Sequence, residues 1–171
     1  MCNGTPIASD DEFACVECTV RNKDLHVDPS PLASCACAHC AVQVAGCFVS
    51  ALYEPDGDSR RDAACRKIVE CGWASRCAGS DCYCGDGVGG ETCLTMANAG
   101  NAKGPCAGLI ERVSGCAGAS LPGNCVLLQQ QTPNSVLARA TAVALCVTGD
   151  PLFKPDLQQE AMCPLDRYGV P

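Results

Sequence analysis

Six cysteines and six glycines crowd into residues 65 to 93, CRKIVECGWASRCAGSDCYCGDGVGGETC. Trp73, the only tryptophan of the chain, lies among them. Glycine has no side chain to bury, so an ordinary packed core cannot form in this stretch. The stretch therefore holds one conformation only if disulfides or metal ions fix it.

Cysteine is dense along the whole chain, with 18 in 171 residues. This is about the density of a disulfide scaffold. The number is even, as complete pairing requires, and such pairing persists in oxidising compartments. We therefore expect an exported protein, located in the extracellular space, in the periplasm or on the outer cell surface.

The apolar interior is expected to be thin, because aromatic residues make up only 4% of the chain. A disulfide that closes a loop of about 15 residues contributes roughly 3 kcal/mol in the chain-entropy model. Several such bridges would dominate the stability of this protein.

Apolar and small residues recur at helical spacing in five segments, which span residues 10–22, 31–53, 59–71, 105–114 and 133–147. We expect the third helix to end at Gly72, and the last to begin at a Thr132 cap and end at Gly149. The segments between the helices are rich in turn residues. The predicted fold is mainly α and disulfide-rich, with about five short helices and long irregular loops.

The first two predicted helices suggest a specific pairing. If they form an antiparallel hairpin, the two residue numbers of every bonded pair add up to the same value. The pairs Cys15 with Cys40 and Cys18 with Cys37 satisfy this condition. We therefore predict these two disulfides as a ladder across the hairpin.

The turn sequence EPDGD at residues 54–58 is the best boundary between two lobes. The predicted division is an N-terminal cysteine-stapled helical hairpin, residues 1–58, and a C-terminal cysteine-rich helical lobe, residues 59–171. The first lobe holds seven cysteines and the second eleven. Both numbers are odd, so full pairing requires at least one bridge between the lobes. The predicted disulfide cysteines of the second lobe are Cys65, Cys71, Cys77, Cys82, Cys84, Cys93, Cys106, Cys116, Cys125, Cys146 and Cys163.

Residues 60–165 resemble a known group of proteins. The successive Cys65, Cys71 and Cys77, the DCYCG sequence at 81–85, the GPC sequence at 104–106 and Ile110-Glu111 look like cysteine-rich exported proteins of myxobacteria, among them surface or lipoprotein-like chains. The resemblance implies export and disulfide bonding, and it assigns no activity.

Metal binding by thiolates is the alternative interpretation of the cysteines. Two C-x2-C pairs and one C-x-C pair have spacings that chelate zinc or copper, and they consist of Cys15, Cys18, Cys37, Cys40, Cys82 and Cys84. The even number of cysteines favours disulfides, so we predict no metal and no other cofactor.

No catalytic machinery is visible in the sequence. The chain has no G-x-S-x-G motif, and its two histidines are His26 in a predicted turn and His39 within a predicted helix. A haem-attachment motif would require a histidine directly after Cys40, where Ala41 stands. We predict that the protein is not an enzyme.

The net charge of −7 counts against nucleic-acid binding, which needs clustered positive charge. No stretch approaches the roughly 18 apolar residues that span a bilayer. A lipid anchor on Cys2 is an alternative to its pairing, since the mature chain of a lipoprotein begins with an acylated cysteine.

These observations predict a structural or protein-interaction subunit of the cell surface, of an extracellular assembly or of a larger complex. Its partner would be another protein or a second copy of itself. Long ordered loops without apolar cover are easier to explain if a partner covers part of them. Aromatic side chains anchor interfaces, so the predicted contacts are Tyr53, Trp73, Tyr83 and Phe153.

Overall fold

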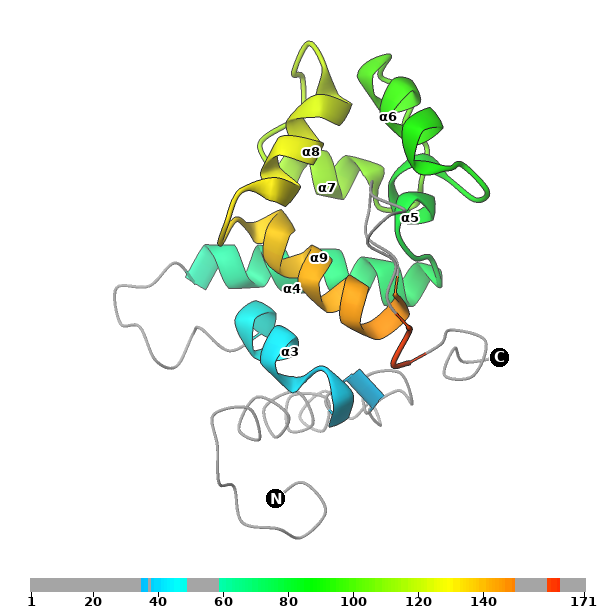
Figure 1. Cartoon of the computed structure of the whole chain (residues 1–171). Helices are drawn as coiled ribbons and strands as arrows, with labels where there is room; N and C mark the ends of the chain where they lie inside the picture. Colours follow the sequence, from blue (N-terminus) through cyan, green and yellow to red (C-terminus); the bar gives the residue numbers. More distant parts are fainter. Residues whose placement is uncertain (1–34, 37, 49–58, 150–159, 164–171) are drawn as a thin grey trace, which may run out of the picture.

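The computed structural model describes residues 35–36, 38–48, 59–149 and 160–163, and these residues form helices and loops without a β-strand (Figure 1). The helices are α3 (Ala41–Phe48), α4 (Ser59–Ser75), α5 (Ser80–Cys84), α6 (Gly90–Asn98), α7 (Ala107–Val113), α8 (Pro122–Gln131) and α9 (Val136–Thr148). Seven disulfides join cysteines within the described residues. The prediction of a mainly α, disulfide-rich fold is confirmed.

The helices form two groups that meet along α9. In the first group, α3, α4 and α9 each contact the other two. In the second group, α6 packs against α8, and α5 contacts both α6 and α7. Helices α7 and α8 also contact α9. Figure 1 shows α3 on one side of α4 and α9, with α7 and α8 on the other.

Three disulfides connect the segment that contains α3 to the rest of the chain. They are Cys35–Cys163, Cys40–Cys146 and Cys47–Cys65. All three cross residue 58, as the odd numbers of cysteines on its two sides require. The division into lobes 1–58 and 59–171 itself stays a prediction.

The predicted bond between Cys15 and Cys40 is wrong, because Cys40 is bonded to Cys146 in α9. The pairing rule assumed that the cysteines of the helix predicted over residues 31–53 face the helix predicted over residues 10–22. In the structure Cys40, Val44 and Cys47, which are spaced three and four residues apart, are buried, and α3 packs against α9 and α4. The predicted Cys18–Cys37 bond and the helix over residues 10–22 lie outside the described residues.

Four predicted helices correspond to helices of the structure. The one predicted over residues 31–53 contains α3, and the other three correspond to α4, α7 and α9, with shifted ends. Helix α4 continues through Gly72 to Ser75, because the residue with the left-handed conformation that ends it is Arg76, whose φ is 54°. Helix α9 is capped by Ser135 and not by Thr132, since the Ala138 N–H donates to Ser135 Oγ over 2.9 Å. Its predicted end at Gly149 is confirmed by a left-handed φ of 80°.

Helices α5, α6 and α8 were not predicted, because α5 has only five residues and the buried residues of α6 and α8 are mostly small: Cys93 and Ala97 in α6, and Pro122, Gly123 and Val126 in α8. In α8, for example, Val126 is buried while Leu128 is 62% exposed. What holds α8 is close contact with α6. A Cβ atom on Gly123 would lie 2.9 Å from the Leu94 carbonyl oxygen. Asn98 at the end of α6 accepts the Asn124 N–H over 2.8 Å, which satisfies one of the free N–H groups in the first turn of α8.

The core of the described residues is small and rich in sulfur. Ten of its 23 buried apolar residues are cysteines, and only four are as large as leucine: Ile68, Tyr83, Ile110 and Leu137. Burial of an aliphatic side chain contributes about 1.5–3 kcal/mol, so few side chains provide that contribution here. The disulfides occupy the positions that leucine and phenylalanine fill in most domains.

Candidate functional site

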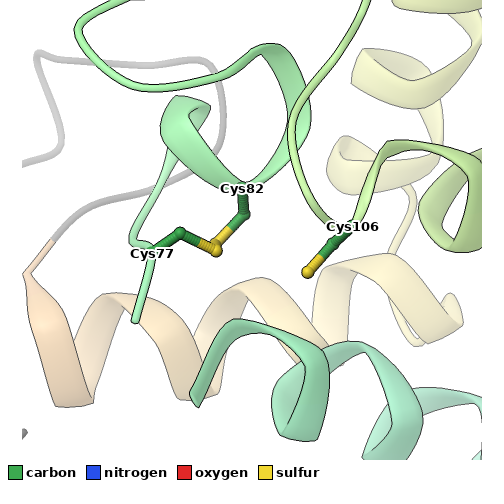
Figure 2. A group of neighbouring side chains, drawn as sticks. All are labelled: Cys77, Cys82 and Cys106. Atoms are coloured by element: carbon green, nitrogen blue, oxygen red, sulfur yellow. A yellow bond between two sulfur atoms is a disulfide. The ribbon is translucent and has the colours of Figure 1, made fainter. Parts of the chain in front are cut away.

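Two neighbouring disulfides lie where α4, α5 and α7 converge. They are Cys77–Cys82, which spans five residues, and Cys71–Cys106. The sulfur atoms of Cys77, Cys82 and Cys106 lie within 4.8 Å of one another. Figure 2 shows the sulfur of Cys106 near the Cys77–Cys82 bond. These sulfur atoms belong to disulfides, whereas cysteine ligates metals as the thiolate, so this arrangement is not a thiolate metal site.

Backbone hydrogen bonds position these disulfides. The Gly104 N–H donates to the Tyr83 carbonyl and the Cys106 N–H to the Cys82 carbonyl, each over 2.9 Å. The chain after α4 is fixed by the Cys77 N–H, which donates to the Gly72 carbonyl over 3.1 Å. The loop before α7 is thus held against α5 by backbone contacts.

A pocket of about 50 Å³ lies beside these sulfur atoms, between α4 and α9. We call it the sulfur-lined pocket. Its walls are formed by Ile68, Val69, Gly72, Trp73, Cys77, Ala78, Gly79, Cys82, Cys106, Ile110, Ala140, Thr141, Ala144 and Thr148. None of these lining residues is charged, and the Thr148 hydroxyl is engaged with the Ala144 carbonyl over 2.8 Å. The pocket suits a neutral, mostly apolar group.

Tyr83 forms a buried polar contact next to the pocket. Its ring is fully buried, and its hydroxyl donates to Glu111 Oε1 over 2.9 Å. Burial, followed by the hydrogen bond to Glu111 and the charge of that carboxylate, raises the pKa of Tyr83 above its ordinary value. The contact ties α5 to α7.

We expect Tyr83→Phe to destabilise the protein by about 1.5–3 kcal/mol at pH 8, as for other hydrogen bonds to charged groups. The effect should shrink as the pH rises above about 10. There the unfolded chain loses the Tyr83 proton, whereas the folded protein retains it because its pKa is raised; ionisation therefore favours unfolding of the wild type only. Urea unfolding of both proteins at pH 8 and pH 11 measures this. An equal difference at both pH values would contradict it.

The structure places most of the predicted disulfide cysteines. All those predicted in the second lobe are bonded, and so is Cys40, although to a different partner. Cys15, Cys18 and Cys37 lie outside the described residues, as does Cys2, the predicted alternative for a lipid anchor. Cys35 and Cys47 were not among the cysteines predicted to form disulfides, and both are bonded. The sequence feature that indicated their bonding was the even number of cysteines, which complete pairing requires.

Three of the six cysteines in the alternative metal-binding set are in disulfides and cannot bind a metal as thiolates. Cys40, Cys82 and Cys84 are joined to Cys146, Cys77 and Cys93. The remaining members, Cys15, Cys18 and Cys37, lie outside the described residues.

The predicted interaction residues separate into different environments. Tyr83 is fully buried, so its prediction as a partner contact is wrong: in a chain with few large side chains, this one fills the core. Trp73 is half-buried and lines the sulfur-lined pocket. Tyr53 and Phe153 lie outside the described residues.

Comparison with protein-family models, curated proteins and solved structures found no match. The resemblance to exported myxobacterial proteins therefore stays a prediction. Among the described residues, no helix has both the length and the apolar character to cross a membrane.

Proposed function

We propose that this protein is an exported, disulfide-stabilised structural or protein-interaction subunit, whose partner is another protein or a second copy of itself. The observation that carries the proposal is the set of seven disulfides among the residues that the structure describes. Such bonds persist in oxidising compartments. They fix a surface that a thin apolar core would not fix alone.

The exposed side of α8 is the surface best suited to a protein partner. Leu121, at the start of the helix, and Leu128 are 50% and 62% exposed. They stand seven positions apart, two turns along one side of a helix. The sequence of α8, PGNCVLLQQQ, carries no charge, and protein interfaces are depleted in charged residues at their centre. This face therefore resembles the centre of an interface more than an ordinary solvated surface.

Site-specific crosslinking tests the interaction. A photoreactive benzoylphenylalanine at position 128 is expected to crosslink a partner in the source cells, while the same group at the exposed Lys67 of α4 is the matched control. Leu128→Glu should abolish the complex because it places a charge at the centre of the interface. If neither position crosslinks and the purified protein sediments as a monomer, the interaction role is wrong.

Cell fractionation tests the location. We expect the protein in the periplasmic, extracellular or surface fraction, with an intact mass that shows paired cysteines before reduction. A cytosolic protein with free thiols would contradict export.

A further inference from the structure

We propose that two neighbouring disulfides, Cys71–Cys106 and Cys77–Cys82, form a thiol-exchange site. A low-molecular-mass thiol that opens the first bond releases Cys106, which then attacks Cys82 and opens the second bond. The products are a new Cys82–Cys106 disulfide, a mixed disulfide on Cys71 and a free thiol at Cys77. The proposal is independent of the interaction role, because it requires no protein partner.

The two cysteines of the first bond differ in exposure. Cys71 is half-buried, and the contact of its sulfur with the Pro105 carbonyl lies at the surface. Cys106 is only 1% exposed. An external thiolate therefore attacks Cys71 and not Cys106. Its sulfur bonds to Cys71 Sγ, the Cys71–Cys106 bond breaks, and the electron pair of that bond leaves with Cys106 as a thiolate.

The released Cys106 sulfur lies beside the second disulfide. The sulfur atoms of Cys77, Cys82 and Cys106 are all within 4.8 Å of one another (Figure 2). The Cys106 N–H donates to the Cys82 carbonyl over 2.9 Å. A disulfide forms only between residues whose backbones lie close together, and this hydrogen bond maintains that condition. Rotation about the side-chain bonds then brings the two sulfurs into contact.

Exposure also decides which sulfur Cys106 attacks. Cys82 is buried, whereas Cys77 is half-buried. A thiolate is unfavourable away from water, so the exchange is favoured when Cys77 is the sulfur that leaves. The Cys82–Cys106 bond forms, the Cys77–Cys82 bond breaks, and Cys77 takes a proton from water. Two disulfides and one thiol are present before and after, so no further oxidant or reductant is needed.

This arrangement occurs once in the part of the chain that the structure describes. No other three cysteine sulfurs there lie within 4.8 Å of one another. The Cys84–Cys93 bond, which joins α5 to α6, has no third sulfur at this distance. When a thiol opens such a bond, the released cysteine can only displace the thiol again. Its pairing therefore stays unchanged.

Limited treatment with reduced glutathione at about pH 8 tests the proposal, since part of a thiol is ionised there. The reaction is stopped with N-ethylmaleimide, which blocks free thiols, and tryptic peptides are mapped without reduction. Trypsin places the four cysteines of the site on three peptides, which span residues 68–76, 77–103 and 104–112.

The three peptides report on each step of the exchange. In the native protein, peptide 104–112 is linked to peptide 68–76 through Cys71–Cys106. After treatment we expect peptide 104–112 to be linked to peptide 77–103 instead. Peptide 68–76 should carry glutathione, and peptide 77–103 should carry one N-ethylmaleimide group.

Two double variants test which bond takes part. In Cys77→Ser/Cys82→Ser the second disulfide is absent, so glutathione should still attach to Cys71 but the new link should be lost. The matched control is Cys84→Ser/Cys93→Ser, which removes the other disulfide of α5 and should leave the exchange intact.

Three results would overturn the proposal. The first is an unchanged link between peptides 68–76 and 104–112. The second is a peptide 104–112 that carries only N-ethylmaleimide, because Cys106 would then be released without attacking its neighbour. The third is the new link at equal yield in Cys77→Ser/Cys82→Ser. If that variant does not fold, judged by circular dichroism, fragmentation of the linked wild-type peptides still identifies the cysteine that Cys106 bonds.

Discussion

Complete reduction and alkylation of the disulfides is expected to abolish the cooperative thermal unfolding of this protein and most of its helical circular dichroism. Ten of the 23 buried apolar residues in the described ranges are cysteines, so reduction removes the cross-links at nearly half of these core positions. Isolated helices shorter than about 12–15 residues are marginal in water. In the part of the chain that the structure describes, five of the seven helices have ten residues or fewer. Retention of a sharp melting transition after alkylation would contradict this expectation.

The two bridges with the greatest sequence separation among the described residues should depend on each other. Cys40–Cys146 lies inside the loop that Cys35–Cys163 closes. When either bond is present, the other closes a loop of only about 20 residues, because the chain path runs through the first bond. Replacing one pair by serine should therefore cost about 3 kcal/mol. A lone bridge would contribute about 4 kcal/mol, because the other disulfides shorten the loop that it closes to roughly 45–65 residues. Removing both pairs should cost about 1 kcal/mol more than the sum of the single effects. Chemical unfolding of the three variants measures this, and strict additivity would contradict the nested arrangement.

Sequence patterns that act over a few residues predicted the features of this fold that depend on neighbouring residues in the chain. The stripes of apolar and small residues in α3, α4, α7 and α9 identified these helices, because each buries one side at helical spacing. The left-handed glycine at Gly149 ends α9 as predicted. The sequence analysis missed helices α5, α6 and α8 because tertiary contacts stabilise them, such as the close approach of Gly123 to α6.

The disulfide partners could not be predicted for a similar reason. Cys35–Cys163 and Cys40–Cys146 join residues 128 and 106 positions apart, and no spacing rule acts over such distances. The antiparallel sum rule used only neighbouring helices, so it missed α9 as the partner of Cys40. The sulfur-lined pocket could not be predicted for the same reason, because its walls come from residues that are far apart in the sequence, on α4 and on α9.

Gly104→Ala is expected to destabilise the protein by about 3 kcal/mol, the upper part of the usual range for overpacking. A Cβ atom at this position would lie 2.5 Å from the Cys82 carbonyl oxygen and 2.5 Å from the Tyr83 carbonyl carbon. Both atoms are backbone, so no side-chain rotation can relieve the overlap. The loop cannot retreat without loss of the Gly104–Tyr83 and Cys106–Cys82 backbone hydrogen bonds.

The matched control for this variant is Gly108→Ala, four residues further on. A Cβ atom on Gly108 would meet nothing within 4 Å, and Gly108 lies inside α7. Alanine there should stabilise the protein by about 0.5–1 kcal/mol, because glycine is the poorer helix former. Urea unfolding at one pH compares the two variants, and non-reducing peptide maps test whether Cys71–Cys106 still forms in each. If both alanine variants unfold at the same urea concentration, residues 104–106 do not pack against α5 as closely as the structure shows, and the wall of the sulfur-lined pocket that Cys106 forms would be wrong as well.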